Sequence, residues 1–129
     1  MKTKINIKIF CMCLVVCIVA IGSLAIISKA ATGNYASLSG GYFTDLDSTQ
    51  WAYASAKNIS NITRYMTVSV KNRYDNVLGS GGGKVSVGGT TSVSSVNITY
   101  VDNAYAHCTV YNSASPSSGS VEYITSPIK

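Results

Sequence analysis

The chain has 129 residues, of which 47% are hydrophobic and 12% are charged, and its formal net charge is +5. Four of its ten basic residues lie within the first thirty positions, so residues 31–129 carry six basic (ten minus four) against five acidic residues. This near-neutral balance argues against a domain that binds nucleic acid or an anionic membrane through a basic surface. Three of the four cysteines also lie in that first stretch, and one remaining thiol excludes an internal disulfide framework.

The first thirty residues have the three parts of a secretory signal peptide. Three lysines form a basic start, an uncharged apolar run covers 9–27, and small residues follow at Ser28 and Ala30. We therefore predict that residues 1–30 form a signal-peptide helix cleaved after Ala30, with the next bond as second choice. An uncleaved membrane anchor is the alternative, because the apolar run nearly reaches the roughly twenty residues needed to span a bilayer.

Residues 31–129 are predicted to form one secreted domain built from β-strands. Apolar and polar residues alternate with a period of two, which places successive side chains on opposite faces of a strand. The expected strands lie at 36–43, 50–56, 62–70, 84–87, 96–101, 104–112 and 121–125. Segments rich in Gly, Ser, Asn and Asp separate them at intervals of about ten residues. The prediction is an all-β fold, a single small antiparallel β-sandwich of six to eight short strands that is Ig-like or jelly-roll-like.

The segment 50–56 reads QWAYASA and alternates small with aromatic side chains. If its three alanines face the core, Trp51 and Tyr53 form an outward aromatic stripe. Just before it, Asp45 and Asp47 stand two residues apart and offer oxygen ligands for calcium. An Asx turn explains these carboxylates equally well, and the third donor and the glycine of a calcium loop are missing.

The segment 62–70 is predicted to be a half-buried strand. Ile62, Met66, Val68 and Val70 share one parity and form its core side. Arg64 falls on the same side, so we expect it near the rim, where its stem packs and its head reaches water.

A glycine-rich stretch follows at 79–83, where four of five residues are glycine. Glycine in a strand loses much backbone freedom and packs no side chain. We therefore expect a hairpin with a flexible glycine tip, followed by a short strand in which Val85 and Val87 point inward. A phosphate-binding loop is rejected because Lys84 is followed by valine and by a strand. The last four residues are expected to be a polar tail.

The segment 104–111, AYAHCTVY, holds the lone histidine and the lone cysteine of positions 31–129. In a strand, His107 and Cys108 lie on opposite faces and cannot share the hydrogen bond of a thiol–imidazole dyad. The small residues at even positions suit the core, so Cys108 is predicted to be buried and inert. Tyr105, His107, Thr109 and Tyr111 then form an outward stripe.

No other group of residues indicates catalysis or a metal. One histidine, one thiol and scattered carboxylates give no zinc-site spacing, and nothing marks a pair of acids as a glycosidase site. Three sequons begin at Asn58, Asn61 and Asn97; we expect them to be unmodified, because the leader resembles bacterial export signals. We predict no enzyme, no metal and no cofactor.

The remaining functional signal is aromatic. Tyr and Trp combine an apolar body with a polar tip, which suits binding to sugars or protein surfaces, although cross-strand tyrosines also stabilise sheets without binding anything. The candidate binding residues are Tyr105, His107, Tyr111, Trp51 and Tyr53.

These residues and the leader together suggest a secreted, bacterial, non-catalytic binding protein. Its partner would be an extracellular glycan or a protein surface, with no nucleic acid and no membrane after cleavage. A bacteriocin-like secreted antagonist is the alternative, although no amphipathic basic segment supports it. An enzyme with an unrecognised site ranks third.

Overall fold

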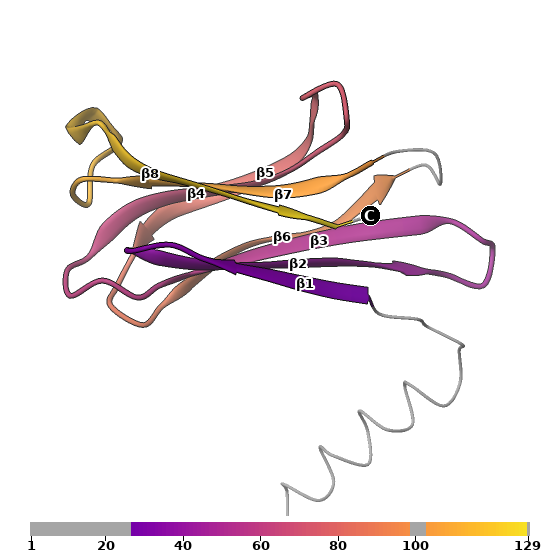
Figure 1. Ribbon diagram of the computed structural model, residues 1–129, viewed down its shortest axis with the longest axis horizontal. Coiled ribbons are helices and arrows are strands. Elements are labelled where there is room, and N and C mark those ends of the chain that lie inside the picture. The colour runs from indigo at the N-terminus through magenta and orange to yellow at the C-terminus, as the bar shows by residue number, and fades with distance from the viewer. Residues whose placement is uncertain (1–26, 99–102, 129) are drawn as a thin grey trace, which may run out of the picture.

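The computed structural model describes residues 27–98 and 103–128, which form two four-stranded antiparallel sheets stacked face to face (Figure 1). The sheets have the strand orders β1-β2-β3-β6 and β5-β4-β7-β8. The strands are β1 (Ile27–Thr32), β2 (Ala36–Thr44), β3 (Gln50–Asn58), β4 (Arg64–Lys71), β5 (Val77–Val85), β6 (Thr90–Ile98), β7 (Tyr105–Tyr111) and β8 (Ser120–Pro127). A short 3-10 turn, η1 (Pro116–Ser118), precedes β8. The predicted all-β fold with antiparallel sheets is confirmed.

Most of the predicted signal peptide lies outside the described residues, as do positions 99–101 of the strand expected at 96–101. β1 nevertheless begins at Ile27, so the predicted cut after Ala30 falls inside a strand. Ala30 pairs with Ser39 and Ala31 pairs with Leu38 of β2. Within the described ranges, no helix is long and apolar enough to cross a membrane.

The core lies between the two sheets and consists mainly of small and β-branched side chains. The three alanines of β3 are fully buried, and so are Met66, Val68 and Val70 of β4. The alternation predicted for 50–56 and for the strand part of 62–70 is therefore confirmed. The largest buried side chains are spread over four further segments: Leu38 in β2, Cys108 and Val110 in β7, Ser126 in β8, and Ile128 just after it.

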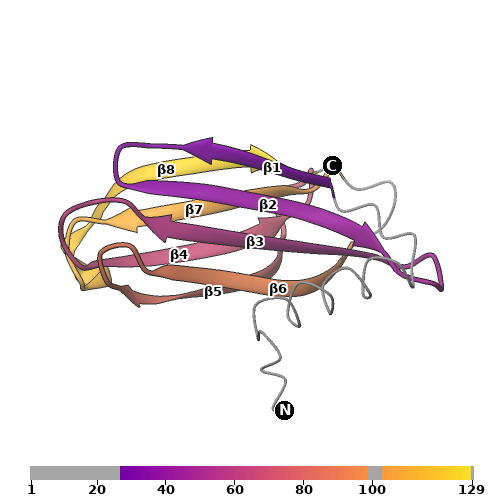
Figure 2. The ribbon, with the colours of Figure 1, turned by 90° about the horizontal axis from the view of Figure 1, so that it is seen from below.

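The chain crosses between the sheets three times, at β3–β4, β5–β6 and β6–β7. As a result β3 and β6 are neighbours in one sheet, while β4 and β7 are neighbours in the other. Figure 2 shows that β5 and β6 lie side by side along one edge of the stack, and β1 and β8 along the other. The sandwich is thus held at both edges by contacts between its two sheets.

The glycine-rich stretch lies within β5, so the predicted flexible tip is wrong. A Cβ atom on Gly81 would stand 2.6 Å from the carbonyl oxygen of Ser92 in β6, and one on Gly82 would stand 2.6 Å from that of Met66. These positions lack room for a side chain because neighbouring backbones approach them closely. The bends on either side of β5 fall instead at 72–76 and at 86–89, where Gly88 has φ 75°.

Three further details differ from expectation. Ile62 and Val87 precede β4 and follow β5 respectively, and with 43% and 56% of their surfaces exposed they are not core residues. β4 begins two residues after the predicted start, and β5 ends two residues before the predicted end, because turns occupy these positions. The last residues are not a polar tail, because Ile128 is fully buried and its N–H donates to the carbonyl of Ala104 at 2.8 Å.

Candidate binding face

The structure separates His107 from Cys108 as predicted. Cys108 is fully buried in the core, whereas His107 is half-buried on the outer surface of the same strand. Burial, with a smaller contribution from Glu122, raises the pKa of the Cys108 thiol to about 12. A thiol with this pKa is protonated at neutral pH and therefore a poor nucleophile.

The outer surface of β4, β7 and β8 gathers several rings and hydroxyl groups that point away from the core. We call it the outer aromatic face. It consists of Tyr65, Thr67, Ser69, Tyr105, His107, Thr109, Tyr111, Tyr123 and Thr125. Cross-strand pairing arranges these side chains in rows, for example Ser69 opposite His107 and His107 opposite Thr125.

Two ring contacts lie on this face. The rings of Tyr65 and Tyr111 meet edge to face with centroids 5.5 Å apart, and those of His107 and Tyr123 are tilted at 5.6 Å. Tyr123 keeps 65% of its surface exposed. Thr109 departs from expectation, because its neighbours Thr67 and Tyr123 leave it only 8% exposed. A ligand on the outer aromatic face can therefore reach the Tyr123 ring but hardly the Thr109 hydroxyl.

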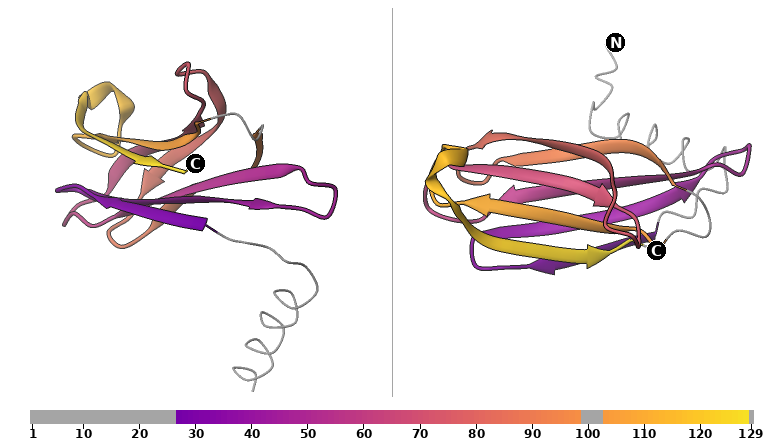
Figure 3. Two further views of the ribbon diagram at one scale, coloured as in Figure 1. Left: turned by 45° about the vertical axis from the view of Figure 1, so that its right-hand side comes forward. Right: turned by 90° about the horizontal axis from the view of Figure 1, so that it is seen from above.

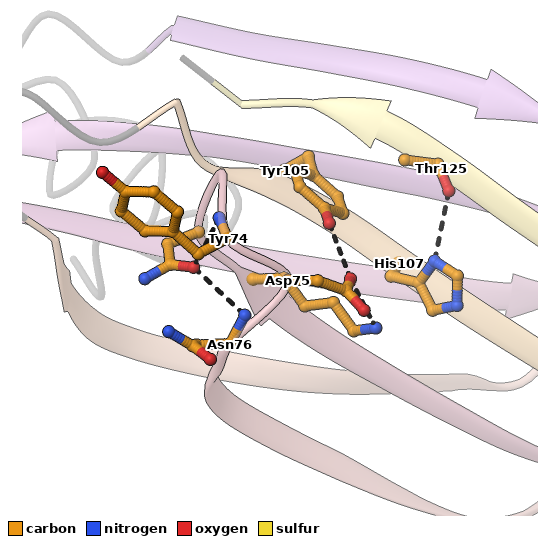
Figure 4. A network of polar contacts seen from close by, with 8 residues as sticks. Tyr74, Asp75, Asn76, Tyr105, His107 and Thr125 are labelled. Atoms are coloured by element: carbon orange, nitrogen blue, oxygen red, sulfur yellow. Dashed lines mark hydrogen bonds and ion pairs between the residues drawn. The ribbon is translucent and has the colours of Figure 1, made fainter.

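A polar network bounds one end of the outer aromatic face (Figure 4). Asp75, in the bend after β4, accepts a hydrogen bond from the Tyr105 hydroxyl at 2.7 Å and pairs with the Lys71 ammonium at 2.9 Å. The Tyr105 bond, then Lys71, holds the pKa of Asp75 below its usual value, and the same bond raises the pKa of Tyr105. The Lys71 ammonium and the Asp75 carboxylate therefore neutralise each other.

His107 sits next to this network. Its Nδ1 atom lies 3.1 Å from the Thr125 hydroxyl oxygen. Partial burial, and then the charge of Lys71, lowers the pKa of the imidazole below its ordinary 6.5, against a smaller opposing effect of Asp75. At neutral pH the ring is therefore uncharged, and it presents a neutral donor and acceptor on the face.

Trp51 and Tyr53 do not join the other candidate residues. They point outward from β3, on the opposite surface of the sandwich, whose two layers are separated in Figure 3. The Trp51 indole donates to Asp45 Oδ2 at 2.8 Å, while Asp45 Oδ1 accepts the backbone N–H groups of Asp47 and Thr49. The indole bond is the main reason that the pKa of Asp45 is lowered. Asp45 thus closes an Asx-type turn, and the five candidates divide between two faces.

A buried polar cluster at the opposite end of β4 was not predicted. Arg64 is only 6% exposed, so the expectation that its head reaches water is wrong. Its Nη1 donates to the carbonyls of Tyr111 and Asn112, its Nε donates to Ser60 Oγ, and its Cζ lies 4.2 Å from the centroid of the Tyr35 ring. These carbonyls lie at the end of β7 and directly after it, nearly fifty residues along the chain from Arg64, so no pattern near Arg64 predicts them. We regard this cluster as structural, because the Nε and Nη1 groups of Arg64 donate to acceptors within the protein.

The Asn58 sequon belongs to the same cluster. Its side chain is fully buried and makes four hydrogen bonds, to the carbonyls of Ile62 and Val85 and from the N–H and hydroxyl of Ser60. A glycan cannot be attached there in the folded chain, whereas Asn61 and Asn97 are exposed.

Over the part of the chain that the structure describes, no group of three or more His, Cys, Asp or Glu residues is placed to hold a metal ion. Comparisons with protein-family models, with curated proteins and with solved structures found no match.

Proposed function

We propose that the chain is a secreted bacterial binding protein without catalytic activity, and that its ligand contacts the outer aromatic face. The observation that carries this proposal is the clustering of two ring pairs and several hydroxyls on β4, β7 and β8. The apolar C–H face of a sugar ring stacks on aromatic side chains while the sugar hydroxyls bond to neighbouring polar groups, and Tyr and His each combine a ring with a polar tip. An extracellular glycan therefore fits this face best.

Charge favours a neutral glycan over an acidic one. The Lys71 and Asp75 charges are paired with each other, and His107 is uncharged at neutral pH. A negatively charged polymer would find no free cationic cluster on β7 and β8 to attract it.

We further propose that the sandwich is Ig-like. The order β2-β3-β6 against β5-β4-β7-β8, with β3 beside β6 and β4 beside β7, supports this choice, because immunoglobulin-type sandwiches place their strands in the same interlocked order. β1 is then an added edge strand.

A glycan array followed by titration calorimetry tests the binding proposal. We expect Tyr123→Ala to weaken binding at least tenfold, because it removes the most exposed ring of the face. Tyr53→Ala is the matched control, since that tyrosine points outward from the opposite sheet. Equal loss in both variants, or binding of a protein surface with no glycan bound, would overturn the proposed ligand.

A further inference from the structure

The predicted signal-peptide cut falls within β1. Cleavage after Ala30 removes 27–30 and leaves only two of the six residues of this strand. The removed residues are the partners of 39–42 in β2. Over that length β2 becomes the edge of its sheet, and its backbone N–H and C=O groups lose their partners.

β2 keeps its place without β1. It pairs with β3 along its whole length, from Ala36 to Thr44, and Leu38 is fully buried in the core. The turn before β2 is also fixed from the other sheet, because the Glu122 carboxylate accepts the backbone N–H groups of Asn34, Tyr35 and Ala36. Cleavage therefore exposes an edge that remains an ordered strand.

The exposed edge lacks the charges and the proline that keep natural edges from pairing. The uncovered part of β2, residues 39–42, continues into 43–44, which β1 does not cover, and this whole stretch holds neither a charge nor a proline. Of the other edge strands, β1 carries Lys29, β5 carries Lys84, and β8 carries Glu122 and Pro127, whereas β6 has neither a charge nor a proline but lies beside β5 of the other sheet. Lys29 leaves with the leader, so cleavage removes both the covering strand and its charge.

We propose that the exported chain forms a symmetric dimer in which the exposed β2 edges of two copies pair antiparallel. This inference rests on the export that the proposed function assumes. A second copy fits because the newly exposed stretch has no charge to repel its own copy: its outward positions hold Ser39 and Gly41, and the outward Phe43 lies beyond them near the end of β2. The outer aromatic face lies on the other sheet and stays free in both copies, which gives the dimer two ligand faces.

The test uses the full chain expressed in an exporting bacterial host, with the product purified from the medium. Mass spectrometry gives its N-terminus, and light scattering coupled to size-exclusion chromatography gives its mass. Two lysine variants form a matched pair. Ser39 in β2 and Ser92 in β6 both pair with Ser55 on one outer surface, but they lie on opposite sides of β3.

We expect an N-terminus at Ala31 or Thr32, a dimer for the unchanged chain and for Ser92→Lys, and a monomer for Ser39→Lys, since a lysine on an edge strand opposes pairing with another strand. A monomeric product beginning at Ala31 or Thr32, a product that still contains Ile27, or a dimer unaffected by Ser39→Lys would each overturn the inference. Glycan titration of the same samples reports on the proposed function separately, because a monomer can still bind through Tyr123.

Discussion

Replacing Asn58 by alanine tests how strongly the buried polar cluster holds the two sheets together. The side chain is fully buried and makes four hydrogen bonds of 2.7 to 3.0 Å, which join the end of β3 to the loop before β4 and to the end of β5. At roughly 1 kcal/mol for each bond, we expect Asn58→Ala to lower the free energy of unfolding by about 4 kcal/mol. A domain of this size has only about 5–15 kcal/mol in total.

Urea denaturation followed by fluorescence gives this change directly, provided that the dependence on urea keeps the same slope. Asn61→Ala is the control, because Asn61 lies three residues away and is exposed; we expect it to change stability by less than about 0.5 kcal/mol. A loss below about 1 kcal/mol for Asn58→Ala would refute the reasoning, since it would mean that water or the remaining cluster replaces the lost bonds.

Three further predictions concern other parts of the fold. The Cys108 thiol, with its pKa raised to about 12, should resist maleimide at neutral pH until denaturant is added; rapid labelling of the native chain would contradict its burial. The lowered pKa of His107 means that the unfolded chain binds its proton more readily, so stability should decrease as the pH falls below the ordinary 6.5 and level off below the folded pKa. NMR titration should place that folded pKa under 6.5, and a higher value would reverse the sign. Gly81→Val should cost about 3 kcal/mol in urea denaturation, because a Cβ there meets the Ser92 carbonyl at 2.6 Å, whereas Ser80→Val on the exposed side of β5 should cost less than about 0.5 kcal/mol.

The alternation of side chains predicted the strands well wherever one face is buried. β3, β4 and β7 each place apolar residues in the core at every second position, and this local pattern is visible in the sequence. The separation of His107 from Cys108 followed from the same rule, because it requires only that the segment is extended.

The errors arose where contacts between distant segments override local preference. Glycine favours loops in isolation, but Gly81 lies in a strand because the Ser92 backbone of the facing sheet occupies the space of a side chain. Arg64 is buried because carbonyls of Tyr111 and Asn112 accept its hydrogen bonds. Neither contact has a signature near the residue concerned.

The candidate site shows the same limit. Which side of a strand faces outward was predictable for Tyr105, His107 and Tyr111, and for Trp51 and Tyr53. Which sheet each strand joins was not, because the pairing of β3 with β6 and of β4 with β7 depends on the whole chain. For the same reason the partners of His107 on β8, Tyr123 and Thr125, were missed.

Mapping of amide chemical shifts during titration with a neutral oligosaccharide from the glycan array tests most directly whether β7 and β8 carry the ligand. We expect the shifts to concentrate at His107, Tyr111 and Tyr123 and to spare β3. Shifts confined to Trp51 and Tyr53 on the opposite sheet would contradict the assignment of the binding face.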